Sequence, residues 1–267
     1  MQTNHFRHAW FWLALAVFAA APQVSAQQVV KPADLSGVWI APGGRLNPVQ
    51  ADRRANPQSQ WSTEMLPFTA EGRAAFEANK PGRGPRAAKP VEVNDPQEGA
   101  NPNGLYRTMM YARPFEIVQT PGKVIQLFGW GLSWRNIYAD GRPVPDAVPA
   151  GPFWYGHSVG KWEGDTLVVT TLALDERAWL DEWGTPYSAE ARIEERWRRI
   201  APDKLQLQIT VNDPVYYTKS WLSIPVTFAL QRGVDPIEII FAPMDMATFN
   251  ETLRKPASPP AEPQTHQ

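Results

Sequence analysis

Three residues whose side chains can do acid–base chemistry lie close together in this chain: Arg135, Asp140 and His157. An imidazole changes charge near neutral pH and can take up or release a proton. An arginine can stabilise the negative charge that develops on a substrate, and Asp140 could carry a second proton. We therefore predict these three as catalytic residues. Two alternatives stay open: a lone histidine is often a packed rim residue, and Asp140 before Gly141 also fits a turn.

Aromatic residues surround this group in the sequence and give it the composition of a ligand pocket. An apolar pocket with a few polar anchors is the usual form of a small-molecule site. The chain has 12 tryptophans, of which Trp10 and Trp12 precede residue 27. Tryptophan suits such pockets, although several could simply fill a barrel. The substrate-binding residues that we predict are Tyr106, Trp130, Tyr138, Trp154 and Tyr155.

Other chemistries find little support. Gly156–Gly160 (GHSVG) has the letters of the hydrolase nucleophile elbow, but that elbow needs a helix after it and a later histidine. A hairpin pattern follows instead, and the only later histidine is His266, near the C-terminus. The chain has no cysteine, which removes thiolate nucleophiles and the common Cys-ligated metal sites. One histidine between residue 27 and the tail, without any cysteine, cannot form the usual zinc or iron sites, so we expect no metal. An all-carboxylate calcium site stays open, although no ligand loop of recognisable spacing occurs. No glycine-rich phosphate loop or dinucleotide fingerprint occurs, so we expect no cofactor.

Short alternating segments separated by turn signals predict a mainly β protein. The expected strands span 34–40, 114–119, 123–128, 134–138, 155–162, 166–171, 191–199, 205–211, 226–231 and 237–241. Long loops and one or two short helices are expected; the helix that can be located has Thr69 as N-cap and a body from Glu71 to Glu77. Strands at this spacing favour a single antiparallel barrel, with a β-sandwich as the alternative.

Alternation along the strands assigns residues to faces. Arg135 shares a face with Ile137, so its guanidinium either enters the barrel or lies outside; inside, it would need a carboxylate or a ligand oxyanion. His157 lies on the face opposite Ser158 and Gly160, whose small side chains would let a neighbouring element approach closely.

The domain boundaries follow from composition. Residues 1–26 have the form of a signal peptide, with an apolar run from Ala9 to Ala21 and a small-x-small site at Val24–Ala26; an N-terminal anchor is the alternative. The expected barrel domain is 27–255, with a long loop or lid at 80–104 and a disordered tail at 256–267. We therefore expect a periplasmic or secreted protein.

The charge and hydropathy of the chain limit which kinds of partner are expected. No later run approaches about 18 apolar residues, so no integral membrane segment is expected after cleavage. The formal net charge is −1, which gives no electrostatic reason to expect nucleic acid. The expected partner is a small apolar or aromatic molecule.

Two stretches carry a resemblance. Leu35–Trp39 (LSGVW) resembles the Gly-x-Trp opening of lipocalin and calycin barrels, which implies that a late arginine covers Trp39; Arg232 is the candidate by position. The segments FEIVQTPGKVIQLF, RNIYADGRPVP, WYGHSVGKWEGDTLVV, WLDEWGTPYS and DPVYYTKSW, between Phe115 and Trp221, are similar to a large, mostly uncharacterised family of exported bacterial proteins. Gly129, Val144 and Tyr187 replace acidic or histidine residues of that family, which implies a less polar pocket.

Three functions remain open. The first is an exported barrel enzyme that transforms a small, aromatic molecule by cofactor-free proton transfer, as a lyase or isomerase. The second is a lipocalin-like binding or transport protein for a lipophilic ligand. The third is a surface or complex-assembly protein, which a large exposed aromatic patch would support.

Overall fold

The computed structural model describes residues 33–41, 58–99, 101–111 and 113–239. All of these belong to one compact unit that is defined by contacts across residues 32–267. The expected signal peptide at 1–26 and the expected tail at 256–267 lie outside the described residues.

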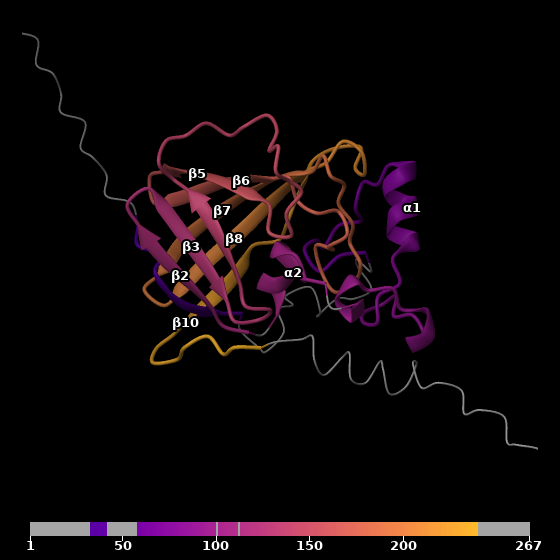
Figure 1. The fold of residues 1–267 in the computed structure, drawn as a ribbon, viewed down its shortest axis with the longest axis horizontal. Coiled ribbons are helices and arrows are strands. Elements are labelled where there is room, and N and C mark those ends of the chain that lie inside the picture. Colours follow the sequence, from indigo (N-terminus) through magenta and orange to yellow (C-terminus); the bar gives the residue numbers. More distant parts are fainter. Residues whose placement is uncertain (1–32, 42–57, 100, 112, 240–267) are drawn as a thin grey trace, which may run out of the picture. The chain divides into compact units, whose positions relative to one another are not determined.

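The described chain is mainly β, as the sequence predicts, and its strands form a single sheet (Figure 1). The strands are β1 (Gly37–Ile40), β2 (Phe115–Thr120), β3 (Lys123–Phe128), β4 (Ser133–Tyr138), β5 (His157–Glu163), β6 (Thr166–Leu172), β7 (Arg192–Ala201), β8 (Lys204–Asn212), β9 (Trp221–Leu222) and β10 (Val226–Gln231). β1 pairs with both β10 and β2, and β10 also pairs with β8. The sheet therefore closes into a barrel from which only β9, beyond β8, is left out. This closure excludes the β-sandwich alternative.

One strand pair departs from the antiparallel expectation. β4 and β5 are parallel, with Ile137 opposite Ser158. The long connection 139–156 returns the chain to the end of the sheet at which β4 begins, so β5 runs in the same direction as β4. A parallel pair requires such a crossover. The expected strand at 237–241 is also different: within the described residues, Ile239 makes only an isolated bridge to Trp130.

The barrel interior is filled by large side chains. Trp39, Trp197 and Phe228 are at most 1% exposed, and Trp197 stacks on Phe228 with ring centroids 5.9 Å apart. The indole N–H of Trp39 donates to Leu35 O at 2.9 Å. Arg199, not Arg232, covers Trp39, at 5.3 Å from the ring. The expectation for Arg232 was wrong because the strand that faces Trp39 with an arginine is β7, and Arg232 follows β10 in an exposed turn.

Helices are few and short. α1 (Ala70–Ala78) confirms the predicted helix, since the Thr69 hydroxyl accepts from Gly72 N at 3.0 Å. The loop 80–104 contains two 3₁₀ turns, η2 (Pro90–Glu92) and η3 (Pro96–Gly99). α2 (Leu105–Met110), which the sequence analysis did not predict, is buried along its whole length. It belongs to the same hydrophobic core as the barrel.

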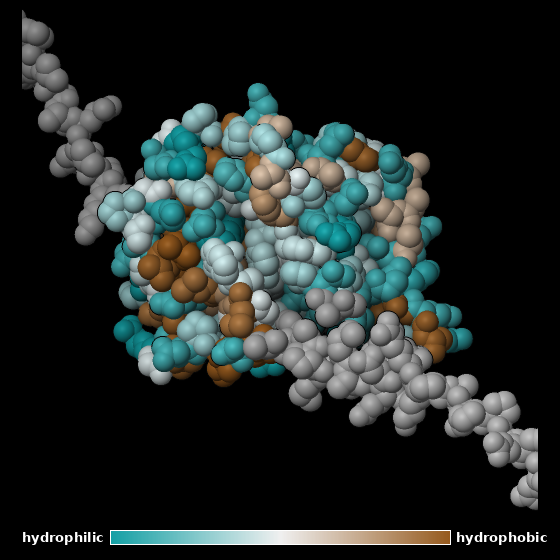
Figure 2. All heavy atoms as spheres, in the orientation of Figure 1, coloured by the Kyte–Doolittle hydropathy of each residue, from teal (hydrophilic) through white to brown (hydrophobic). Residues whose placement is uncertain are grey.

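The outer surface of the barrel carries some apolar side chains. Val118 and Ile125 are cross-strand partners on β2 and β3, and hydrophobic atoms gather over this region (Figure 2). Leu127 and Trp134 continue this row and are 36% and 63% exposed. In the described part of the chain, no helix has the length and apolar character needed to cross a membrane.

Candidate functional site

Arg135 lies inside the barrel, where its charge is matched by Glu195 of β7. Its two terminal nitrogens donate to the Glu195 carboxylate at 2.9 and 2.8 Å, and its Nε donates to Ser158 Oγ at 3.0 Å. The two side chains are 1% and 0% exposed. Of the two positions that the sequence left open for Arg135, the structure shows the interior one, with a carboxylate partner.

Polar side chains around this pair add further hydrogen bonds. Tyr106 of α2 and Thr171 of β6 each donate to Glu195 Oε1 at 2.8 Å, and the Trp197 indole donates to Oε2 at 2.8 Å. Burial, followed by the charge of Glu195, raises the pKa of Tyr106 well above its ordinary value. Tyr106 and Arg135 thus belong to a closed polar network that holds α2 against the barrel.

His157 lies on the opposite face of the same wall. Ser158 points inward to Arg135, so His157 at the preceding position of β5 points outward. Its ring tilts against Tyr138, with centroids 5.6 Å apart. Burial and then the charge of Arg142 lower the pKa of His157. The structure therefore brings His157 together with Tyr138 and separates it from Arg135.

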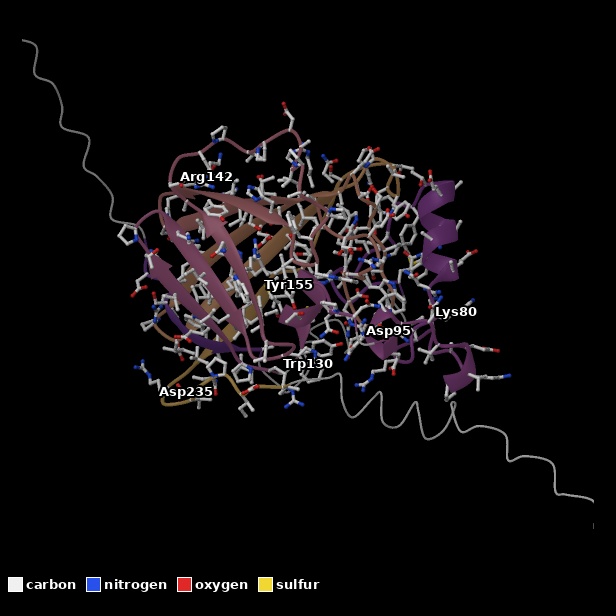
Figure 3. The ribbon with its side chains drawn as sticks, viewed as in Figure 1. Lys80, Asp95, Trp130, Arg142, Tyr155 and Asp235 are labelled. Atoms are coloured by element: carbon white, nitrogen blue, oxygen red, sulfur yellow. The ribbon has the colours of Figure 1, made fainter. Side chains whose placement is uncertain are left out.

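Asp140 also lies on this outer surface. Its carboxylate forms an ion pair with Arg142, two residues later in the same turn, whose terminal nitrogen is 2.6 Å from Oδ2. The Arg142 guanidinium lies over the Tyr138 ring at 3.9 Å, and its hydrogen bonds lower the pKa of Asp140. Figure 3 shows Arg142 well away from Trp130 and Asp95. His157, Tyr138, Asp140 and Arg142 form what we call the outer cluster.

Two of the three remaining predicted aromatics, Tyr155 and Trp154, occupy separate positions. The Tyr155 ring stacks on Phe128 at 5.7 Å, and its oxygen accepts from Ser133 Oγ at 2.7 Å. Trp154 lies under Arg177, whose guanidinium is 4.6 Å from the ring. The eight predicted site residues therefore do not converge on a single pocket.

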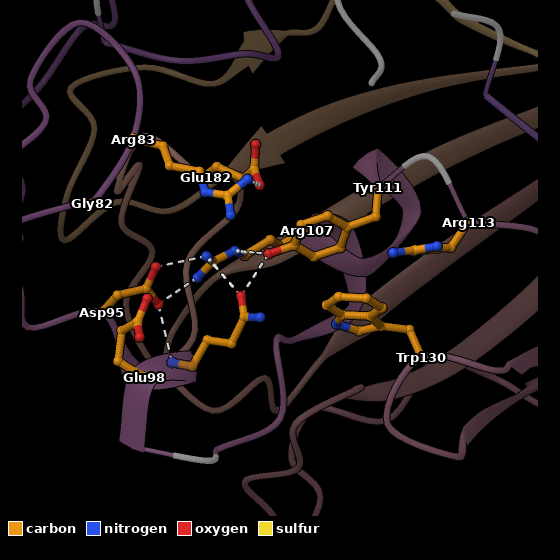
Figure 4. A pocket seen from close by; sticks show the side chains of 10 residues that line it. Gly82, Arg83, Asp95, Glu98, Arg107, Tyr111, Arg113, Trp130 and Glu182 are labelled. Carbon is orange, nitrogen blue, oxygen red and sulfur yellow. Dashed lines mark hydrogen bonds and ion pairs between the residues drawn. The ribbon is translucent and has the colours of Figure 1, made fainter. Parts of the chain in front are cut away.

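A pocket of about 390 Å³ lies outside the barrel, between the loop 80–104 and the end of α2, and Trp130 is the only predicted site residue that lines it (Figure 4). Its volume is in the range of small-molecule sites. The charged lining side chains are Arg83, Arg107, Arg113, Asp95, Glu98 and Glu182. The pocket is thus much more polar than the apolar site that the sequence predicts.

A second bidentate ion pair forms part of the pocket lining. Arg107 of α2 donates to both carboxylate oxygens of Asp95 at 2.6 Å. Its remaining bonds go to Gln97 Oε1 at 3.0 Å and to the Tyr111 oxygen at 2.9 Å. Burial acts to lower the pKa of Arg107, but the bonds to Asp95 and the charges of Tyr111, Asp95 and Glu182 together raise that pKa. Arg107 is therefore a fixed cation that holds the loop against α2.

The aromatic wall of the pocket is made by Trp130 and Tyr111, whose rings stack at 5.1 Å. The Tyr111 hydroxyl donates to Gln97 Oε1 at 2.7 Å, and burial raises its pKa to about 12. Arg113 lies over Trp130 at 5.2 Å from the ring. This wall can hold a planar group, since aromatic faces stack on such groups and attract cations.

Glu182 supplies a carboxylate at the pocket surface. Its side chain is 10% exposed, and Arg83 approaches it only to 3.8 Å. Such a loosely paired and nearly buried carboxylate can accept a proton or bind a cationic group of a ligand. Among the described residues, no group of three or more histidine, aspartate or glutamate side chains is placed to hold a metal ion.

Most of these lining residues were not predicted from the sequence. The loop 80–104 was expected to be a lid, but Asp95 and Glu98 within it were not predicted as site residues. An acid twelve residues before Arg107, in a loop that must return to the start of α2, is the one signal that could have indicated the ion pair.

Comparisons with known proteins add no identity, because no family model, curated protein or solved structure matches this chain.

Proposed function

We propose that this chain is an exported, lipocalin-like barrel protein that binds a small molecule in the pocket beside the barrel. The observation that supports this most directly is the pocket itself: an aromatic wall of Trp130 and Tyr111 next to a cation, Arg107, that is already held in place. A preformed site loses little side-chain entropy when a ligand binds. The barrel supplies the rigid support, because its interior is filled.

Replacement of the aromatic wall tests this proposal. We expect Trp130→Ala to weaken binding of a retained aromatic compound about tenfold or more, because large aromatic anchors dominate binding energy. Ligands would be found by incubating the protein with a mixed aromatic library and identifying retained compounds by mass spectrometry. Trp134→Ala, on the outer barrel surface, is the matched control. Equal retention by both variants would contradict the proposal.

A second candidate is the lyase or isomerase function, with Glu182 as the proton acceptor in the same pocket. The observation that favours it is the loose pairing of the Glu182 carboxylate at 3.8 Å from Arg83. We expect Glu182→Gln to abolish conversion of a bound compound and to preserve its binding. Loss of conversion in His157→Ala instead would assign the chemistry to the outer cluster. If the unaltered protein retains the compound but does not convert it, the enzyme candidate is rejected and only the binding function remains.

A further inference from the structure

We infer that the pocket takes a zwitterion: a small molecule with a carboxylate at one end, an ammonium group at the other and a planar group between them. This inference rests on the proposed binding function and names the chemical class of the ligand. It follows from how the charged side chains are distributed around the pocket.

The charges are separated across the pocket. Figure 4 shows Arg113 and Trp130 on one side, Asp95 and Glu98 on the other, and Arg107 between them. Arg107 and Asp95 neutralise each other through two bonds of 2.6 Å. Besides the loose pair of Arg83 and Glu182, which is 3.8 Å apart, the groups left to meet a ligand are a cation, Arg113, at one end and an acid, Glu98, at the other.

Neither of these two groups has a charged partner within the described chain. Arg113 contacts the ring of Trp130, and no acidic side chain lies within ion-pair distance of it among those residues. Glu98 makes no side-chain ion pair in the same set. An apolar ligand would take water from both groups and return nothing, which costs free energy. A ligand with one charge of each sign would compensate both.

The total charge of the lining argues against a simple anion or cation. Three arginines face three acids around the pocket, so their formal charges cancel. A carboxylate without an ammonium group would gain from Arg113 but would be repelled by Glu98 and Glu182. An amine without a carboxylate would be attracted by Glu98 and Glu182 but repelled by Arg83 and Arg113. Complementary charges on both ends satisfy the pocket and set the orientation of the ligand.

Three probes that share one ring system test the inference: L-tryptophan, tryptamine, which lacks the carboxylate, and indole-3-propionate, which lacks the ammonium group. Affinities would be measured by titration calorimetry on the full chain at neutral pH and low salt. We expect L-tryptophan to bind about tenfold or more tightly than either analogue, which corresponds to about 1.4 kcal/mol.

Two variants assign the ends. Arg113→Gln should weaken binding of L-tryptophan and indole-3-propionate about three- to tenfold and should not weaken binding of tryptamine, which Arg113 repels. Glu98→Gln should weaken binding of L-tryptophan and tryptamine and should not weaken binding of indole-3-propionate. Arg177→Gln is the matched control for a cation over an indole ring outside the pocket. Glu92→Gln is the matched control for an exposed acid of the same loop.

The outcomes separate the inference from the function on which it rests. If either analogue binds as tightly as L-tryptophan and Trp130→Ala weakens it, the zwitterion inference is overturned and the binding pocket stands. If none of the three binds, the inference is overturned as well, and retention of other library compounds that depends on Trp130 then decides the proposed function.

Discussion

Two buried arginine–carboxylate pairs with the same geometry occupy different environments in this molecule. Arg135 and Glu195 lie inside the barrel, and Arg107 and Asp95 lie beside the pocket. Each pair is bidentate, and each has a tyrosine of the α2 region attached to it: Tyr106 donates to Glu195, and Tyr111 accepts from Arg107.

The difference is what surrounds the two pairs. Serine, threonine, glutamine and tryptophan side chains complete the bonds of the inner pair, which is at most 1% exposed. The pair beside the pocket is 5% and 7% exposed and borders open space. Burial of charge alone therefore does not mark a site: a network closed on every side supports the fold, and one that opens onto a cavity can meet a ligand.

Breaking the inner pair should have the largest effect. Glu195→Gln leaves Arg135 buried without a countercharge, and we expect the free energy of unfolding to fall by about 3–5 kcal/mol. Urea denaturation followed by circular dichroism measures this. A joint Arg135→Met and Glu195→Leu replacement should recover part of the loss, because no charge is then left unpaired. A loss below about 1 kcal/mol in Glu195→Gln would contradict the structural role.

Breaking the pair beside the pocket should cost less stability and more binding. Asp95→Asn keeps the shape of the side chain but leaves Arg107 without its acid, and water in the pocket can solvate the exposed charge. We expect a loss of about 1–3 kcal/mol of unfolding free energy, measured in the same way, together with weaker retention of the pocket ligand. Asp165→Asn, an exposed partner of Arg198, is the control. An equal loss of unfolding free energy in Asp95→Asn and Glu195→Gln would contradict the different roles that we assign to the two ion pairs.

Much of the fold could be predicted because local patterns determine it. The hairpin of β2 and β3 follows from Pro121-Gly122, and Gly122 has the positive φ of 75° that such a turn favours. The inward face of β5 follows from alternation, and a side chain on Gly160 would meet Ile137 at 2.9 Å. The parallel pairing of β4 with β5 could not be predicted, because it depends on the path of the loop 139–156.

The site could be predicted only in part, since its residues are far apart in the sequence. The expectation that Arg135 needs a carboxylate inside the barrel was confirmed, but Glu195 lies 60 residues away and no local signal selects it. Trp130 was predicted for its type. Arg83, Glu98 and Glu182 come from a loop and a turn whose positions are set by tertiary contacts, so composition alone could not place them around one pocket.

A titration of the tyrosines tests how strongly each of the two networks holds its tyrosine proton. Burial raises the pKa of Tyr111 to about 12 from the ordinary value near 10. Because the folded state holds this proton more tightly, its contribution to stability is complete below about pH 10 and is lost as the pH rises towards 12. The absorbance of ionised tyrosine, compared between the unaltered protein and Tyr111→Phe, measures this step. Burial and the charge of Glu195 also raise the pKa of Tyr106, so Tyr106 should not ionise at the ordinary value near 10. Its ionisation there would contradict its place in the enclosed network.

The smallest effect is expected at the outer cluster, which lies on neither side of the comparison. The pKa of His157 is lowered by burial and by Arg142, so its contribution to stability is present above the ordinary histidine range and is lost as the pH falls through the lowered value. Arg142→Gln removes a positive charge, and we expect the pKa of His157 to rise, as measured by nuclear magnetic resonance of the imidazole. Unfolding and pocket binding should stay unchanged in this variant, because His157 faces away from Arg135 and Arg142 lies far from Trp130. A change in pocket affinity would instead show that the outer cluster and the pocket are coupled through the wall of the barrel.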